Sequence, residues 1–206
     1  WNNLALKSCT DCTIDGVKLT GAKNHTLDLA NGGAGVKNLT FKNCVIMAST
    51  GFRENNPQIL GPINGLNVIN CAITSGYLLP SIGHETQLSG PVVVRNNIFF
   101  NAGSGGGELI GQVNNDTPVT WDIDYNAYVG AGNFNTTTWR DTRGGTSKDY
   151  YADVNGNGIV DNVGSSDMDD WQALGFDAHS IVIADTDYRT STAQYASAIW
   201  GPNGPT

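Results

Sequence analysis

A short segment in the C-terminal half of the chain, residues 153–161, has the residue types and spacing of a calcium-binding loop. Oxygen-bearing side chains stand at its positions 1, 3, 5 and 9, which are Asp153, Asn155, Asn157 and Asp161. Calcium prefers oxygen ligands, and Gly158 at position 6 allows the sharp turn that such a loop needs. Position 12 is Gly164 instead of a carboxylate, so Asp167, Asp169 or a water would complete the site. The alternative is a Gly/Asn-rich turn without a metal.

Other side chains that could do chemistry stand in polar or glycine-rich loops. Glu85 and Glu108 could form a pair of carboxylates, the arrangement that hydrolyses glycosidic bonds. Arg53 and His84 could instead remove a proton next to a uronate carboxylate, with Glu54 and Glu85 holding a calcium ion. Either reaction needs these loops to be brought together by the elements between them.

Those elements come from a repeat of about 27 residues. The segment Leu39-Thr-Phe-Lys-Asn-Cys-Val-Ile46 has the same pattern as Leu66-Asn-Val-Ile-Asn-Cys-Ala-Ile73, which begins 27 residues later. Further copies stand at 12–19, 92–99 and 121–128, at steps of 27, 26 and 29 residues. A period in this range is typical of architectures built from stacked structural repeats.

Alternation of apolar and polar residues predicts which side chains face inward, because strand side chains point alternately to the two faces. One inward column contains Ile14, Phe41, Val68, Val94 and Ile123, and another contains Leu19, Ile46, Ile73, Phe99 and Tyr128. The turn between them holds Gly16, Asn43, Asn70 and Asn96. Asn tolerates the left-handed conformation there, and stacked amides can hydrogen-bond to one another.

These features predict an all-β fold, a right-handed parallel β-helix (a solenoid with three short strands per coil). A chain wound as a coil makes parallel strands without the helical crossovers that they otherwise need. Third strands are expected at 25–29, 58–60, 85–88 and 108–110. The loops before the last three, 48–57, 75–84 and 101–107, would emerge at the same edge, where repeat scaffolds usually carry function.

The repeat fades after Gly130, which divides the chain into three parts. We expect coils over 1–130, a mostly irregular extension packed on the last coil over 131–189, and a tail or linker over 190–206. The extension should contain a short helix at 167–174, capped by Ser166, and a final strand at 181–183. Residues 133–148 are expected to be irregular. Because a stacked-coil protein needs a polar cap and Leu4-Ala-Leu6 is already strand-like, the chain is interpreted as a mature product or fragment that lacks upstream coils.

Composition excludes several classes of protein. The formal net charge of −8 argues against nucleic acid, and no apolar run approaches the length of a membrane span. Four cysteines are too few for a disulfide scaffold of this size. Cys44 and Cys71 occupy the same slot of consecutive repeats and are predicted to be buried thiols. Cys9 and Cys12 form a single CxxC motif, and because no second CxxC motif accompanies it, a zinc site is not favoured.

Two segments carry a resemblance to a known family, Asp124-Tyr-Asn126-Ala-Tyr128 and Trp171-Gln-Ala-Leu174-Gly-Phe-Asp177-Ala-His179-Ser180. The chain resembles secreted bacterial right-handed β-helix proteins of the pectate-lyase-like superfamily. The repeats over 9–130 match the generic coil pattern, and the second segment is similar to the C-terminal end of many members. The superfamily includes polysaccharide lyases, glycoside hydrolases, epimerases, phage tailspikes and non-catalytic adhesins, so the fold alone does not select a function.

The resemblance implies that carbohydrate is bound on one sheet and the loops preceding it. Mapped onto this sequence, that face has catalytic candidates Glu85, Glu108, His84 and Arg53, and substrate-binding candidates Asp28, Glu54, Gln58 and Gln87. Coils about 4.8 Å apart put side chains one or two coils distant at roughly 5–10 Å, which suits both retaining and inverting carboxylate pairs. The alternative is that these residues are ordinary solvated side chains.

A second outward column, formed by Asp15, Lys42, Arg95 and Asp124, alternates in sign and is predicted to be a structural ladder of charges. His179 is expected to pack against the last coil rather than to act in catalysis. The favoured hypothesis is a secreted or cell-surface bacterial protein that binds and cleaves a polysaccharide, as a lyase or a hydrolase. The alternative is a non-catalytic adhesive or structural β-helix, and the oligomeric state is left open.

Overall fold

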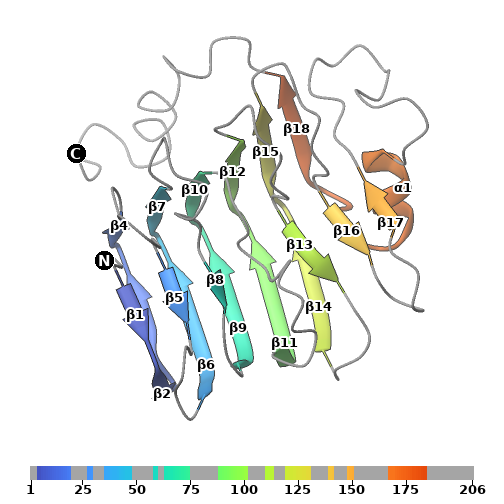
Figure 1. Ribbon diagram of the computed structural model, residues 1–206. Helices are drawn as coiled ribbons and strands as arrows, with labels where there is room; N and C mark the ends of the chain where they lie inside the picture. The colour runs from blue at the N-terminus through green and yellow to red at the C-terminus, as the bar shows by residue number, and fades with distance from the viewer. Residues whose placement is uncertain are drawn as a thin grey trace.

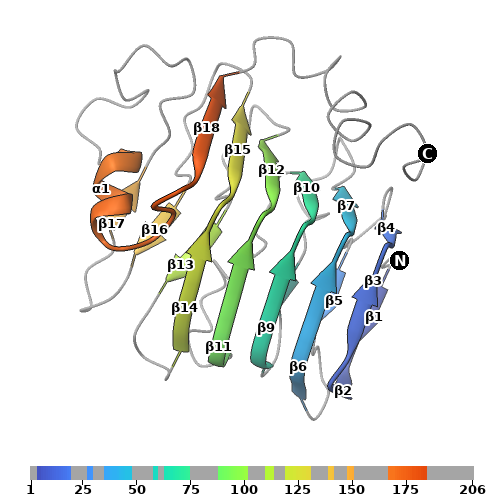
Figure 2. The ribbon, with the colours of Figure 1, turned by 180° about the vertical axis from the view of Figure 1, so that it is seen from behind.

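A computed structural model describes residues 4–19, 27–29, 35–47, 58–59, 63–74, 88–101, 110–113, 119–130, 139–141, 148–150 and 167–184 (Figures 1 and 2). Within these ranges the chain is almost entirely β-strand, with one short helix, so the predicted all-β class is confirmed. Figure 1 shows strands from successive repeats lying side by side along the molecule. None of its described helices is long and apolar enough to cross a membrane.

Two six-stranded sheets, made almost wholly of strands from the repeats, form most of the structure, and all their pairings are parallel. The long-strand sheet runs in the order β14 (Val119–Asp124), β11 (Leu88–Arg95), β9 (Ile63–Ile69), β6 (Gly35–Lys42) and β2 (Ser8–Thr10), with β3 (Thr13–Asp15) also paired to β6. The short-strand sheet runs in the order β18 (Ile181–Ala184), β15 (Ala127–Gly130), β12 (Ile98–Asn101), β10 (Ala72–Thr74), β7 (Val45–Met47) and β4 (Lys18–Leu19).

Two three-stranded sheets complete the described strands. One contains β1 (Leu4–Leu6), β5 (Leu27–Leu29) and β8 (Gln58–Ile59), all parallel, which confirms third strands within 25–29 and 58–60. The other contains β13 (Ile110–Val113), β16 (Trp139–Asp141) and β17 (Lys148–Tyr150), and its last pair is antiparallel. The two sheets are separate, so the third strands do not continue as one parallel sheet through the described repeats.

Two of these observations correct the sequence-based predictions. Leu88, expected to end a separate third strand, begins β11 of the long-strand sheet. Residues 133–148 were expected to be irregular, yet β16 lies among them. The reason is Trp139, which is fully buried and packs edge-on against Tyr128 with ring centroids 4.8 Å apart. Burial of so large an aromatic side chain fixes a segment that its polar neighbours would not hold in place.

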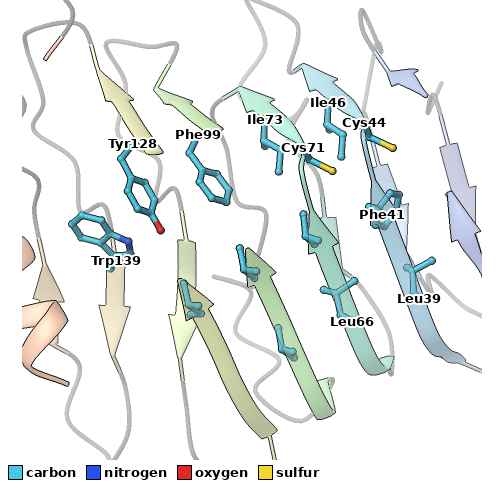
Figure 3. Close-up of a cluster of buried hydrophobic side chains, with 14 of the residues drawn as sticks. Leu39, Phe41, Cys44, Ile46, Leu66, Cys71, Ile73, Phe99, Tyr128 and Trp139 are labelled. Atoms are coloured by element: carbon cyan, nitrogen blue, oxygen red, sulfur yellow. The ribbon is translucent and has the colours of Figure 1, made fainter. Parts of the chain in front are cut away.

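The register of the parallel strands confirms both predicted inward columns. Phe41 is paired with Ile14 on one side and Val68 on the other, and Val68, Val94 and Ile123 continue the row. In the short-strand sheet the row Leu19, Ile46, Ile73, Phe99 and Tyr128 is likewise continuous and ends at Val182. Figure 3 labels five members of these columns among the buried side chains: Phe41, Ile46, Ile73, Phe99 and Tyr128. Each fully buried side chain of this size contributes about 1.5–3 kcal/mol.

The turn between the two large sheets repeats a left-handed residue, as predicted. Gly16, Asn43, Asn70 and Asn96 have φ of 67°, 54°, 54° and 56°. The next member of this column is Tyr125, at φ 57°, and not the neighbouring Asn126. An aromatic residue therefore occupies a conformation that glycine and asparagine tolerate best.

A second left-handed column, not predicted, lies within the long strands. It contains Asp11, Asn38, Gly65 and Gly90, at φ 54°, 51°, 84° and 71°. The Asn38 side-chain amide donates to Asp11 Oδ1 at 2.7 Å, and a Cβ on Gly65 would lie 3.0 Å from Asn38 Oδ1. Glycine at 65 therefore gives both the positive φ and the space that the Asn38 side chain occupies.

The described part of the C-terminal extension closes the end of the two large sheets. Helix α1 (Met168–Ala173) is capped by Asp167, whose carboxylate accepts the Asp170 N–H at 3.2 Å; the expected cap, Ser166, lies outside the described residues. The last strand, β18, pairs in parallel with β15 and confirms the strand expected at 181–183. Trp171 of α1 is fully buried against Trp139 and Phe176.

The four cysteines are free thiols, and Cys44 and Cys71 are buried in the same slot of adjacent repeats, as predicted. The Cys71 thiol donates to the Ile69 carbonyl. Its hydrogen bond to Cys44 and its burial raise the pKa of the Cys71 thiol, which keeps it protonated. In the next two repeats the same slot is filled by Asn97 and Asn126, whose buried amides are hydrogen-bonded at 3.1 Å.

Candidate functional site

Most of the site residues predicted from the sequence lie outside the described residues. This holds for the catalytic candidates Arg53, His84, Glu85 and Glu108, the binding candidates Glu54 and Gln87, and the calcium-loop residues Asp153, Asn155, Asn157 and Asp161. The structure brings together the backbones of Asp28 and Gln58, which are paired residues of β5 and β8. The roles assigned to all of these residues remain predictions.

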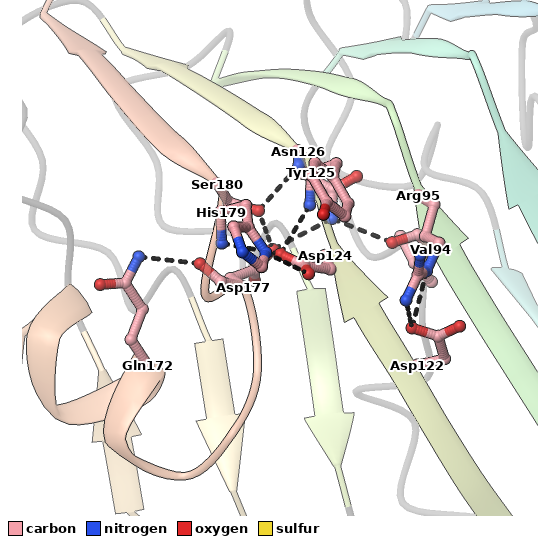
Figure 4. Close-up of polar contacts among 10 residues, drawn as sticks. All are labelled: Val94, Arg95, Asp122, Asp124, Tyr125, Asn126, Gln172, Asp177, His179 and Ser180. Carbon is pink, nitrogen blue, oxygen red and sulfur yellow. Dashed lines mark hydrogen bonds and ion pairs between the residues drawn. The ribbon is translucent and has the colours of Figure 1, made fainter.

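A different cluster of polar side chains lies at the edge of the long-strand sheet, where β14 ends (Figure 4). We call it the outer ladder, and it consists of Asp122, Arg95, Tyr125, His179 and Asp124. Arg95 comes from the repeat before Tyr125, and His179 from the segment after it. The ladder therefore joins three successive levels of the stack.

The first part of the outer ladder is an ion pair between two neighbouring strands. Arg95 at the end of β11 donates from Nε and Nη2 to Asp122 Oδ1 of β14, both at 2.7 Å. This pairing raises the pKa of the Arg95 guanidinium and keeps it charged. The Asp15–Lys42 step of the predicted charge ladder is present at 3.1 Å. The predicted pairing of Arg95 with Asp124 is wrong, because Arg95 forms its ion pair with Asp122 and the Asp124 carboxylate is paired with His179.

Asp124 is the centre of the second part. Its Oδ1 accepts the backbone N–H groups of Tyr125 at 2.9 Å and His179 at 2.8 Å, and its Oδ2 lies 2.8 Å from His179 Nδ1. Burial acts to raise the pKa of Asp124, but the hydrogen bonds from the His179 ring and backbone and from the Tyr125 backbone outweigh it and hold the pKa below its usual value. The carboxylate is therefore ionised and fixed in orientation.

Tyr125 lies between the two charged parts. Its ring stacks on the His179 imidazole, with centroids 4.7 Å apart and planes 5° from parallel, and the Arg95 Cζ lies 5.6 Å from the same ring. These contacts offset a left-handed backbone that costs on the order of 1–3 kcal/mol for a bulky residue. The ring nevertheless remains 47% exposed. A strained, exposed aromatic residue held between two charged groups is a candidate for binding.

His179 is the most accessible member, with a side chain 60% exposed. Of its two ring nitrogens, only Nδ1 has a hydrogen-bond partner among the described residues, the Asp124 carboxylate. When Nδ1–H donates to that carboxylate, Nε2 presents a lone pair to the solvent and can accept a hydrogen bond or a proton. His179 does pack on the last repeat, through Tyr125, as expected, yet its free edge faces outward.

A buried hub lies directly beneath the outer ladder and positions it. The hub is Asp177, fully buried, with four donors to its carboxylate: Asn126 Nδ2 at 3.0 Å, Tyr128 OH at 2.8 Å, Trp171 Nε1 at 2.8 Å, and Ser180 Oγ. Burial and the Asp177 charge raise the pKa of Tyr128 well above its usual value, so its hydroxyl stays a donor. Four donors compensate for the loss of water that would otherwise make a buried carboxylate unfavourable.

The hub fixes the turn that carries His179. The Asp177 N–H donates to the Ile123 carbonyl at 2.7 Å, and the Asn126 N–H donates to Ser180 Oγ at 2.7 Å. Residues 177–180 are thus tied to β14 on both sides of His179. Sequence reasoning missed the roles of Asp177 and Tyr125. The segment from Trp171 to Ser180, which carries the family resemblance, was the available indication that this turn is specified.

Comparison with known proteins gives no match: no family model, no curated protein and no solved structure is similar to this chain. The resemblance to the pectate-lyase-like superfamily therefore rests on the sequence pattern and on the mostly parallel strands in two large sheets. Because a fold does not determine a function, the function has to be argued from the side chains of the site.

Proposed function

We propose that the stacked repeats wind as a right-handed parallel β-helix of the pectate-lyase-like type, and that the protein is a secreted or cell-surface protein that binds a polysaccharide. The observation that carries this proposal is the outer ladder, an exposed row of Arg95, Tyr125 and His179 held in place by carboxylates. A polysaccharide is an extended chain, and parallel repeats offer an extended face with the same register at each level.

The chemistry of the outer ladder suits sugar hydroxyl groups. The carboxylates accept hydrogen bonds, the guanidinium donates them, and the imidazole can do both; each group is already oriented by a neighbour. Side chains that are held in one rotamer before binding lose little conformational entropy when the ligand arrives. The ladder stands at the end of a strand of the rigid sheet, which favours precise placement of the ligand.

For cleavage, the Asp124–His179 pair is the described group best suited to proton transfer. The carboxylate orients the imidazole through Nδ1 and leaves Nε2 for a reacting proton, as in other general acid–base pairs. Lyase and hydrolase chemistry both use such a group. Glu85, Glu108, His84 and Arg53 remain the candidates predicted from the sequence for the rest of the reaction.

The proposal is tested by electrophoresis of the protein through gels that contain dissolved polysaccharides. Slower migration in at least one polysaccharide gel than in a plain gel is expected, and release of reducing ends or of unsaturated uronates from the same glycans would add cleavage. Migration unaffected by every glycan of a panel of neutral and uronate polysaccharides would overturn the proposal.

The second candidate, a non-catalytic adhesive protein, is favoured by one observation. The carboxylates of Asp122 and Asp124 are both occupied, by Arg95 and His179, as expected of a ladder whose function is to hold repeats together. Retention in a glycan gel without any product would support this alternative and remove the lyase and hydrolase hypotheses.

Calcium at the loop 153–161 belongs to the same proposal, since extracellular repeat proteins can use the ion for stability. A bound ion at one hundred times its dissociation constant stabilises the folded state by about 2.7 kcal/mol. The melting temperature should therefore rise when calcium is added and fall when a chelator is added. The double variant Asp153→Ala/Asp161→Ala is the control and should melt at the same temperature in both solutions. A wild-type melting temperature that the chelator does not change would contradict calcium binding at this loop.

A further inference from the structure

Towards the C-terminal ends of the long strands, the outward side chains form two rows along the stack, which we call the outer rows; the exposed Lys37 lies nearer the start of β6, outside them. The first contains Thr13, Thr40, Asn67, Val93 and Asp122, and the second contains Asp15, Lys42, Ile69, Arg95 and Asp124. The second row ends at the outer ladder. Any chain lying along this face of the sheet therefore meets these side chains first.

Each cation of the outer rows is already matched by a carboxylate. Lys42 Nζ lies 3.1 Å from Asp15 Oδ2, and the Arg95 guanidinium lies 2.7 Å from Asp122 Oδ1. With Asp124 included, three carboxylates face two cations, so the rows carry a net charge of −1 when His179 is neutral. The whole chain has a formal net charge of −8. Neither the outer rows nor the chain as a whole has a net positive charge that would favour an anion.

The remaining polar groups of the outer rows are uncharged. The Asn67 side-chain amide donates to Thr40 Oγ1 at 3.1 Å, and Thr13 stands in the same row. Hydroxyl and amide groups hydrogen-bond to sugar hydroxyls without a charge on either partner. These groups lead along the stack towards the exposed ring of Tyr125 and the open Nε2 of His179.

We infer that the outer ladder and the outer rows take a neutral, hydroxyl-rich glycan and reject a uronate chain. The inference rests on the proposed function and names its substrate class. The Arg95 guanidinium already uses Nε and Nη2 on Asp122, so a uronate carboxylate would either replace that ion pair or bind the remaining N–H groups beside a carboxylate of the same charge, and neither brings a net gain. A sugar hydroxyl needs no such exchange, because it can donate to Asp122 or Asp124 while both ion pairs stay intact.

A second consequence is that the selectivity should be reversible by one isosteric change. Asp122→Asn keeps the shape of the side chain but removes the charge that matches Arg95. The freed guanidinium can then bind a carboxylate as a charge-assisted pair, and the variant should gain at least about tenfold in affinity for a uronate chain. Asp170→Asn makes the same change in net charge on the exposed side of α1, away from the outer rows, and should gain nothing.

The experiment is affinity electrophoresis at low ionic strength with a chelator present. The gels contain a neutral polysaccharide (a β-glucan, a galactomannan or a xylan) or a uronate polysaccharide (polygalacturonate or alginate). The expected result is retention of the wild type in at least one neutral gel and in no uronate gel, with uronate retention acquired by Asp122→Asn alone. Equal shifts of Asp122→Asn and Asp170→Asn would assign the effect to net charge and overturn the inference.

The outcomes separate this inference from the proposed function. If a uronate gel retains the wild type, the inference is overturned but polysaccharide binding is not. This holds whether retention occurs with the chelator present or only after calcium is added. Retention in no gel overturns both.

A further variant tests where the glycan binds. Tyr125→Asn restores the residue type that the earlier repeats carry at this left-handed position, so it should fold. It should lose neutral-glycan retention at least about tenfold, since the exposed ring is removed. Unchanged retention would overturn the placement of the glycan at the outer ladder.

Discussion

The carboxylates of Asp124 and Asp177, which both bind the turn at 177–180, lie in opposite environments. Asp177 accepts four hydrogen bonds from uncharged donors, is fully buried, and has no cation among its partners in the described residues. Asp124 accepts from two backbone N–H groups and pairs with a histidine that is 60% exposed. The Asp177 carboxylate is enclosed in the core, whereas the Asp124 carboxylate is hydrogen-bonded to a side chain that is exposed to solvent.

The difference indicates where stability and function are separated in this molecule. Asp177 accepts four hydrogen bonds and is fully buried, so the hub stabilises the fold and positions the ladder without contacting a ligand itself. The outer ladder is held in place by the hub through residues 177–180, yet its own members are exposed. Substitutions in the hub should therefore change the free energy of unfolding, and substitutions in the ladder should change binding.

The largest effect is expected for Asp177→Ala. This change takes the Asp177 acceptor from one N–H of the Asn126 amide, from the Tyr128 hydroxyl and from the Trp171 indole N–H in a buried site, and the free energy of unfolding should fall by about 3–5 kcal/mol. Asp177→Asn is the control of equal size, which keeps one oxygen and should lose less. Urea denaturation measures both; a midpoint of Asp177→Ala equal to that of the wild type would show that the hub does not hold the fold.

Asp177 also marks the limit of sequence reasoning. The inward columns could be predicted because apolar residues recur at the repeat spacing and alternate within each strand, so that Phe41 and Val68 had to stack. A carboxylate breaks that pattern, since charged residues are almost never fully buried unless paired. Two of its four donors, Asn126 and Tyr128, stand 51 and 49 residues earlier in the chain, and only the folded structure brings them to the carboxylate.

Tyr125 shows a second limit. Asparagine is favoured in the turn column because it tolerates a positive φ, and in this repeat the nearest asparagine, Asn126, stands one residue after that position. The fold instead places the Asn126 amide in the buried slot of Asn97, where it bridges repeats, and leaves the strained position to Tyr125. Packing of two amides in the core outweighs the local preference of one residue. The loops that carry Glu85 and Glu108 lie outside the described residues, so the site predicted there remains a prediction.

A smaller effect on stability is expected for Tyr125→Asn, and it would sharpen the comparison. The change removes the stack on His179 and the contact with Arg95, together worth about 1 kcal/mol, but relieves a left-handed aromatic residue that costs a similar amount. The unfolding free energy should stay within about 0.5 kcal/mol of the wild type while glycan retention falls. A fall of more than about 2 kcal/mol in the free energy of unfolding would show that the outer ladder, like the hub, mainly stabilises the fold.

The effect of His179→Ala on stability is expected to be of similar size, and its pH dependence carries the information. The folded-state pKa of Asp124 lies below its ordinary value of 3.8, so its interactions stabilise the protein above that pH and are lost as the pH falls through the folded pKa. Removing the imidazole takes away part of this depression. The variant should unfold about 0.5 kcal/mol more easily at neutral pH, a typical value for an exposed pair.

The difference between the two proteins should shrink as the pH falls below about 4 and close below the lowered pKa of Asp124, where the carboxylate is protonated in both proteins. Lys18→Ala, an exposed substitution in β4 of the other large sheet, is the control and should keep the same offset from the wild type at every pH. Urea denaturation at several pH values measures the differences. A His179→Ala offset that persists unchanged into acid would mean that the histidine acts by packing on Tyr125 alone, and that Asp124 does not orient it for proton transfer.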